Sequence, residues 1–392
     1  MLLVECYSEV FSTTIGGDVP LKWVDEWELG SVGRLFTTRR VQVVWDYQRS
    51  EFMRWVSVTT TRLVGQSVVL VVLVVCAAIS AKPAVIDAQS PLDVTAEMVE
   101  EWMMELSNWG RWGSDDQLGT LNLVTPDKRR QAVALAVTGI SVSMSHNYLK
   151  EPAADATSPL IHDMLRIDSP GAFRSDRYTI AYHGYAHSHM DSLCHMMHQG
   201  RMYNGFSRDE EVTEAGCNRL AIINFKQGIV TRGLLMDIPR LKGVPYLEPG
   251  TPIYVEDLEA WEEQAGIRVE SGDIVFVRSG RWARRAAHGP WATGEEAAGL
   301  HASVIPWLRE RGVAMLGSDD TNDVRPSGVE GVTQPVHQLT LVAMGMPLFD
   351  NLDLESVAEE AGRQNRWEFM LVAAPLAVEG GTGSPLNPLA IF

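Results

Sequence analysis

Residues 183–198 read HGYAHSHMDSLCHMMH and hold five of the ten histidines of the chain. In an extended strand, successive side chains alternate between the two faces of the sheet. If the segment is extended as far as Asp191, one face carries His183, Tyr185, His187, His189 and Asp191. This alternation predicts a strand that presents imidazoles and a carboxylate side by side.

The second half of the stretch contains a compact H-x-D-x-x-x-H set, His189, Asp191 and His195. Imidazole nitrogens and a carboxylate oxygen suit a divalent transition ion, zinc or manganese above all, with an open position for water. Histidines also cluster by chance, and a single surface histidine is usually solvated, which is what we expect of His198 and His301. For the set of three, the residue types, the alternation and the spacing agree and together predict a metal site.

Strand-like and helix-like runs alternate on both sides of this stretch. We expect strands over residues 139–145, 177–182, 228–236, 273–278 and 313–317. We expect helices over residues 95–106, 126–137, 255–265, 302–310 and 354–364, with Thr95 and Thr125 as the first two N-caps. The alternation, with Gly and Pro turns between the runs, predicts one α/β domain over residues 94–392.

The N-terminal part of the chain differs from this domain. Residues 67–79 read SVVLVVLVVCAAI, follow Arg54 and Arg62, and precede the small residues Ser80 and Ala81. A basic region, a short apolar run and a small-residue boundary are typical of a secretory signal peptide, which we place over residues 53–88. Residues 1–52 would then be an upstream extension, with translation starting at Met53, and the mature protein would be exported to the periplasm or secreted. The alternatives are a buried Val-rich strand and a cytoplasmic protein.

Composition excludes several classes of protein. The chain of 392 residues is 45% hydrophobic and 21% charged, which is ordinary for a well-cored domain. Its formal net charge of -17 and the lack of a basic patch argue against nucleic acid as a partner. No Rossmann or P-loop glycine pattern indicates a nucleotide cofactor. The four cysteines lack CxxC spacing and are too few for a disulfide scaffold, so we expect Cys194 to be a buried structural thiol.

The histidine segment resembles the cyclase-like metal-dependent hydrolases, which include bacterial kynurenine formamidase and isatin hydrolase. Their signature reads roughly HxGTHxDxPxH, and residues 185–195 read YAHSHMDSLCH, so that His189, Asp191 and His195 match position by position. Tyr185, His187 and Leu193 depart from it, and the preceding His183–Gly184 pair is similar to the longer branch of the family. Further similarity covers residues 108–392, including WGRWGSDDQLGTLNLVTPDKRR, GIVTRGLLMD, GDIVFVRSGRW and PVHQLTLVAMGMPLFDNLDL.

The resemblance implies a fold, a set of site residues and an assembly. The fold is a single α/β domain of the swivelling β/α type, with a mixed central β-sheet flanked by helices. His337 would be a further active-site or metal histidine, and Asp350 lies near the position of the family's glutamate. The small-molecule substrate would be processed by a homodimer or homotetramer with no membrane insertion after signal removal.

The implied activity is hydrolysis of an amide, formamide, lactam or lactone by metal-activated water, in the manner of an arylformamidase. His189 and Asp191 would hold the ion with help from His183 or His187, and one or two ions would bind. His195 would act as general base and then acid, with His337 and Asp350 completing the site. Tyr185 either donates a hydrogen bond to an oxyanion or serves packing. The alternatives are an exported metal- or ligand-binding protein without turnover and a metal-dependent lyase or dehydratase.

Two other groups of residues have weaker patterns. Asp319, Asp320, Asn322 and Asp323 follow an expected strand but lack the spacing of a calcium-binding EF-hand, so we expect a loop near the pocket. Trp109, Trp112 and Trp282 lie in segments with family resemblance. They either belong to the core or line an aromatic substrate pocket.

Overall fold

The computed structural model describes four strands between residues 11 and 58 and residues 93–165, 171 and 173–392. The chain divides into two compact units, Met1–Gln89 and Ser90–Phe392. The first contains an antiparallel sheet in the order β1 (Phe11–Thr14), β2 (Pro20–Leu29), β3 (Leu35–Tyr47) and β4 (Ser50–Val58). The apolar run of the expected signal peptide, residues 67–79, lies outside the described residues.

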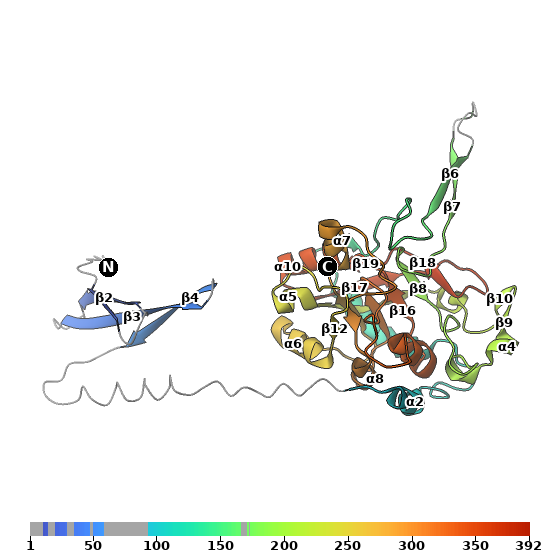
Figure 1. Ribbon diagram of the computed structural model, residues 1–392, viewed down its shortest axis with the longest axis horizontal. Helices are drawn as coiled ribbons and strands as arrows, with labels where there is room; N and C mark the ends of the chain where they lie inside the picture. Colours follow the sequence, from blue (N-terminus) through green and yellow to red (C-terminus); the bar gives the residue numbers. More distant parts are fainter. Residues whose placement is uncertain are drawn as a thin grey trace. The chain divides into compact units, whose positions relative to one another are not determined.

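The second unit is built on a nine-stranded mixed sheet (Figure 1). In spatial order its strands are β18 (Gly383–Pro385), β8 (His189–Asp191), β16 (Leu348–Asp350), β15 (Met315–Ser318), β13 (Ile274–Arg278), β11 (Ile229–Asp237), β17 (Glu368–Ala373), β19 (Leu389–Ile391) and β5 (Ser141–Ser143). The central strands β11, β13, β15 and β16 are parallel, and antiparallel strands extend the sheet at both ends. This is the predicted fold class, a single α/β domain with a mixed sheet flanked by helices.

Helices α2, α3 and α6 begin where the sequence predicts. Thr95 caps α2 (Ala96–Glu105) by accepting a hydrogen bond from the Met98 amide, and Thr125 caps α3 (Pro126–Val133) in the same way from Lys128. The other α-helices are α4 (Arg208–Glu211), α5 (Ile238–Lys242), α6 (Val255–Ala265), α7 (Arg281–His288), α8 (Ile305–Arg311), α9 (Pro335–His337) and α10 (Glu355–Gln364). Short helical turns are η1 (Gly119–Leu123), η2 (Tyr203–Gly205), η3 (Ile222–Phe225), η4 (Ala302–Val304) and η5 (Gln338–Met344). None of the helices in the described ranges combines the length and apolar character needed to cross a bilayer.

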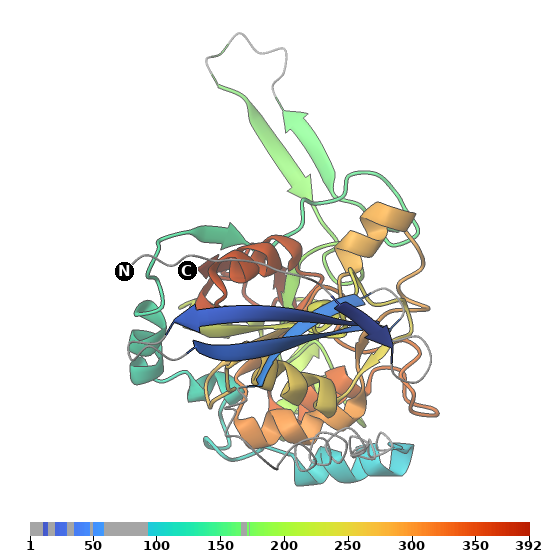
Figure 2. The same cartoon turned by 90° about the vertical axis from the view of Figure 1, so that its left-hand side faces the viewer.

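A two-stranded arm projects from the body of this unit (Figures 1 and 2). It pairs β6 (Ile161–Leu165) with β7 (Ser175–Thr179) in antiparallel register. The strand expected over residues 177–182 is therefore part of the arm rather than of the central sheet. Two smaller pairings complete the strands: β9 (Val212–Thr213) with β10 (Gly216–Cys217), and β12 (Pro252–Ile253) with β14 (Gly299–Leu300).

Two expectations about the histidine segment are wrong. The extended strand is limited to residues 189–191, because residues 183–187 form bends in which Gly184 has a φ of 133°. Asn351 donates a 2.6 Å hydrogen bond to the Gly184 carbonyl and stabilises this path. Cys194 is buried as expected but is not a free thiol, because β10 brings Cys217 close enough for a disulfide, with a Cα–Cα distance of 6.6 Å.

Aromatic side chains fill the core on the central strands. The fully buried Phe276 of β13 lies with its ring centre 5.8 Å from that of Phe349 and 5.9 Å from that of Phe369. These rings come from β16 and β17, so the cluster joins strands that are far apart in sequence.

We expect the substitution Phe276→Ala to lower the free energy of unfolding by about 3–5 kcal/mol, because it leaves a cavity under two aromatic neighbours. Urea denaturation of the full chain measures the effect. Met104→Ala, at a side chain that is 75% exposed, is the control and should change stability by less than about 0.5 kcal/mol. Equal effects of the two substitutions would contradict this account of the core.

Candidate metal centre

Strand β8 places the histidine segment between two other strands. It pairs with β16 so that His189 lies opposite Asp350, and with β18 so that Asp191 lies opposite Gly383. Residues directly opposite each other in an antiparallel pair share a face. His189, Asp191 and Asp350 therefore lie on the same face of the sheet.

Three side chains form a first group of possible metal ligands: His183, His189 and Asp191. The Nδ1 atom of His183 lies 3.0 Å from Oδ1 of Asp191, and Nε2 of His189 lies 3.5 Å from the same oxygen. His189 and Asp191 are each 1% exposed. Of the two histidines that could assist this pair, the structure brings His183 into the group.

A second group consists of Asp191, His337 and Asp350, all buried. The Nε2 atom of His337 lies 3.2 Å from Oδ2 of Asp350 and 3.8 Å from Oδ2 of Asp191. His189 joins the two groups, because its Nε2 lies 3.9 Å from Oδ2 of Asp350. Asp191 therefore belongs to both groups, and residues about 150 positions away in the sequence, His337 and Asp350, lie beside it.

Each of the three histidines in these groups has its other ring nitrogen fixed. Nδ1 of His189 lies 2.8 Å from the His187 carbonyl oxygen, and Nε2 of His183 lies 2.9 Å from Oγ1 of Thr382. Nδ1 of His337 lies 2.6 Å from Oδ2 of Asp323. Such partners fix the tautomer and the ring orientation of metal-binding histidines. The free nitrogens all face the carboxylates.

The donor set fits a divalent cation. Within the described part of the chain, neither buried oxygen of Asp191 accepts a hydrogen bond, and Nδ1 of His183 has no hydrogen-bond partner either. A buried carboxylate without donors is costly unless a positive charge faces it. Nitrogen and oxygen ligands without sulfur are those that zinc and manganese accept in proteins.

The pKa values reflect this concentration of charge. Burial alone would raise the pKa of Asp191, but His195, His183 and His189 outweigh burial and hold that pKa well below its ordinary value. Burial alone would lower the pKa of His337, but Asp350 and Asp323 raise it well above the ordinary value. Neighbouring imidazoles therefore favour the ionised form of Asp191, and neighbouring carboxylates favour the protonated form of His337.

The acidic turn after β15 lies near the centre, as the sequence predicts, and two of its residues also support the ligands, a role that the sequence does not predict. Asp323 holds His337 through the ring nitrogen and also accepts hydrogen bonds from the amides of Val336 and His337. Asn322 donates a 2.5 Å hydrogen bond to Oδ1 of Asp350. Asp319 accepts hydrogen bonds from the amides of Ser279 and Gly280. The available signal was the run of acidic residues directly after a buried parallel strand.

His195 lies beside the two groups rather than in them. Its ring stacks on that of His183 with centres 4.0 Å apart, and its Nε2 lies 3.8 Å from Oδ2 of Asp191. Its side chain is 29% exposed, as is that of His183, whereas His189 and Asp191 are buried. Burial lowers the pKa of His195, and Asp191 opposes that shift in part. A neutral imidazole therefore borders the centre on a side open to solvent.

His187 and Tyr185 point elsewhere. Nε2 of His187 lies 3.2 Å from the Ser158 carbonyl oxygen, and this ring joins neither ligand group among the described residues. The Tyr185 ring lies under the guanidinium of Arg325, 5.1 Å away. The phenol nearest the centre is that of Tyr182, whose ring centre is 4.5 Å from that of His183 and whose hydroxyl donates to the Gly383 carbonyl.

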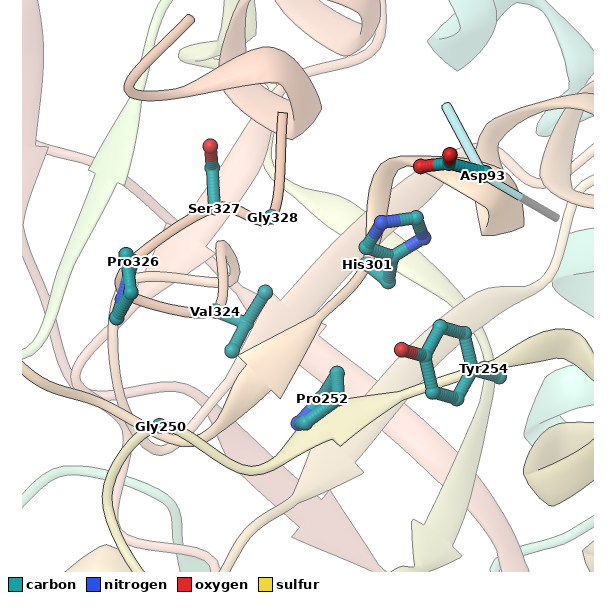
Figure 3. A pocket seen from close by; sticks show the side chains of 9 residues that line it. All are labelled: Asp93, Gly250, Pro252, Tyr254, His301, Val324, Pro326, Ser327 and Gly328. Atoms are coloured by element: carbon teal, nitrogen blue, oxygen red, sulfur yellow. The ribbon is translucent and has the colours of Figure 1, made fainter. Parts of the chain in front are cut away.

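The sequence predicts that His198 and His301 are solvated. His198 is partly exposed and lies 3.0 Å from Glu100. The expectation of a solvated His301 is wrong: it is 6% exposed, because it packs between Tyr254 and Gly328. His301 lines a cavity of about 420 Å³ (Figure 3) that contains no residue of the two ligand groups. Its lining residues are Asp93, Gly250, Pro252, Tyr254, His301, Val324, Pro326, Ser327 and Gly328.

Trp109, Trp112 and Trp282 pack against other residues and do not line the cavity beside His301. Trp282 is 5% exposed, donates a hydrogen bond to the Leu352 carbonyl and stacks on His146. Trp109 donates to the Val342 carbonyl, and Trp112 lies under the guanidinium of Arg111. Each ring therefore has a local structural partner.

The chain is similar to known proteins in sequence and in fold. Residues 136–322 match the family model described as putative cyclase. A solved structure described as a novel cyclase is 29% identical, covers 74% of this chain and 99% of its own, and has a TM-score of 0.66. A solved isatin hydrolase bound to the product analogue thioisatinate is 18% identical, covers 68% of this chain and 99% of its own, and has a TM-score of 0.45. No protein of curated function matches the chain. The resemblance predicted from the histidine segment is therefore confirmed, in that residues 136–322 are similar to the cyclase family.

Proposed function

We propose that the protein is a metal-dependent hydrolase that cleaves a non-peptide amide, formamide, lactam or lactone. The observation that carries this proposal is the buried Asp191 carboxylate, with two oxygens free of hydrogen-bond donors and imidazole nitrogens on both sides. The match to the cyclase family supports it. The implied cofactor is a divalent ion, zinc or manganese.

The chain offers five side chains to hold the ion: His183, His189, Asp191, His337 and Asp350. The two ligand groups share Asp191 and accommodate one ion or two. When bound, such an ion supplies Lewis acidity, which polarises a carbonyl group and acidifies water. The protein then has to orient the substrate and move protons.

His195 is the residue best placed to move the proton. Its imidazole borders the centre, is partly open to solvent, and has a pKa lowered by burial, so Nε2 can accept a proton from water at neutral pH. The same nitrogen can return that proton to the leaving group. Tyr185 we assign to packing, because its ring lies against Arg325.

His195 also separates this proposal from its alternatives. A protein that binds metal without turnover needs no imidazole beside its ligand set. A lyase or dehydratase would use the same residues but would leave no solvent oxygen in its product. Reaction in ¹⁸O-labelled water distinguishes the two: a hydrolase places one labelled oxygen in the carboxylic acid product.

We also propose export and self-association. The disulfide between Cys194 and Cys217 is typical of an oxidising compartment and supports an exported protein. The arm of β6 and β7 exposes Ile161, Met164 and Tyr178, and an isolated two-stranded ribbon is at best marginally stable in water. Contact with a second copy would cover these side chains.

The substitution Asp191→Asn should abolish tight metal binding, because it removes the shared charge while preserving side-chain size. We expect the affinity for zinc to fall about 100-fold or more. Elemental mass spectrometry and calorimetric titration of the full chain measure this. Asp163→Asn, at an arm residue paired with Arg177, is the matched control and should keep its metal. Unchanged metal content in Asp191→Asn would refute the site.

The substitution His195→Gln should keep the metal but lower kcat by about 10²–10⁴-fold, because a proton acceptor is lost and the ligands remain. A panel of formamides, lactams and lactones first identifies a substrate for the unaltered chain. His198→Gln, three residues away and paired with Glu100, should retain full activity. Loss of metal in His195→Gln would show that His195 is a ligand instead.

Metal affinity should weaken as the pH falls. His337 has a raised pKa, so it carries a proton at neutral pH, and a metal must displace that proton. Binding should therefore release at least about one proton near pH 7. Titration calorimetry in buffers of different ionisation enthalpy counts the protons. Binding that releases none would contradict a role for His337 as a ligand.

A further inference from the structure

The loop of residues 380–383 lies between two layers beside the metal centre. On one side, the amide and the hydroxyl of Ser192 donate hydrogen bonds of 3.0 and 2.8 Å to the Thr382 carbonyl. On the other side, the amide of Cys217 in β10 donates a 2.9 Å bond to the Gly380 carbonyl. The loop is thus bonded both to the turn after β8 and to the β9–β10 hairpin.

The disulfide spans the same two layers. Cys194 belongs to the turn after β8, Cys217 belongs to β10, and the two residues are 6% and 5% exposed. The hydroxyl of Ser192 also lies 3.3 Å from Sγ of Cys194. The covalent link therefore holds together the two elements that enclose the loop.

The enclosed backbone leaves little room for movement. A Cβ atom at Gly216 would lie 2.5 Å from the Gly380 carbonyl oxygen. A Cβ atom at Gly383 would lie 2.5 Å from the Met190 carbonyl oxygen and 3.0 Å from Cε1 of His183. Glycine at both positions allows the three segments to approach this closely.

The enclosed loop and the turn after β8 each contact or contain a residue at the metal centre. Oγ1 of Thr382, in the enclosed loop, lies 2.9 Å from Nε2 of His183. His195 follows Cys194 directly, and its amide donates a 3.1 Å hydrogen bond to the Ser192 carbonyl. The disulfide, the turn after β8 and the enclosed loop together therefore orient His183 and His195, whose rings stack on each other.

We propose that the Cys194–Cys217 disulfide is a positioning element of the metal centre, which clamps the 380–383 loop and thereby orients His183 and His195. Its catalytic consequence rests on the proposed hydrolase function. Without the link, hydrogen bonds alone hold the turn to the hairpin, and such segments open locally at low cost. The centre would then spend part of the time with His183 and His195 out of position.

The test compares three forms of the full chain, all with Cys6→Ser and Cys76→Ser, so that the parent keeps only Cys194 and Cys217. These are the parent, the variant Cys194→Ser with Cys217→Ser, and Ser192→Ala, which keeps the disulfide but loses one bond to Thr382. Mass spectrometry after alkylation without reductant first counts free thiols, and none are expected in the parent. Hydrogen exchange then follows the amides of residues 192–195 and 380–383.

In the disulfide-free variant we expect about tenfold faster exchange in these two segments and unchanged exchange in β13. Zinc affinity should fall about tenfold, as is usual when a partner of a metal ligand is lost. With an identified substrate, kcat should fall more than KM changes. Ser192→Ala should shift exchange in the same segments to a smaller extent.

Three results would overturn the proposal. Free thiols in the parent would remove the link itself. Unchanged exchange in both segments would show that the hydrogen bonds suffice, and a uniform rise across the domain would show a role in global stability alone. Failure of the hydrolase function would appear differently, as a parent chain that hydrolyses nothing while exchange and zinc affinity still respond to the disulfide.

Discussion

The buried carboxylate of Asp191 is the constraint on which the rest of the site depends. It is 1% exposed and accepts no hydrogen bond from the described residues, so its charge is balanced by the imidazoles around it. An uncompensated charge in such a place would cost several kcal/mol. The positions of His183, His189 and His337 are therefore conditions for folding as well as for binding a cation.

The sheet meets this condition by placing β8 between two strands from the C-terminal half of the chain. Pairing with β16 sets Asp350 opposite His189, and pairing with β18 sets Gly383 opposite Asp191. Glycine is required there because a Cβ atom would lie 2.5 Å from the Met190 carbonyl oxygen and 3.0 Å from Cε1 of His183. A register shift of β8 by one residue would move His189 and Asp191 to the other face, so the backbone pairing fixes these two ligands.

The sequence predicts the elements of this fold well and the closure of the site incompletely. Thr95 and Thr125 identify two helix starts because capping is local chemistry. The alternation of side chains correctly places His189 and Asp191 on one face. It wrongly extends the strand to residues 183–187, where Asn351, which is distant in the sequence, stabilises a bend. The roles of Asp323, Thr382 and Cys217 depend on pairing between segments that no local pattern specifies.

The opposite pKa shifts of Asp191 and His337 indicate how the centre balances its charge. The imidazoles of His195, His183 and His189 lower the pKa of Asp191, and the carboxylates of Asp350 and Asp323 raise the pKa of His337. A proton on His337 and a divalent cation between the carboxylates are two ways to neutralise the same acidic residues, Asp191, Asp323 and Asp350. A cation must displace the proton, so binding is coupled to pH. The ligands come from segments that are far apart in the sequence and meet only in the folded domain, so binding is coupled to folding as well.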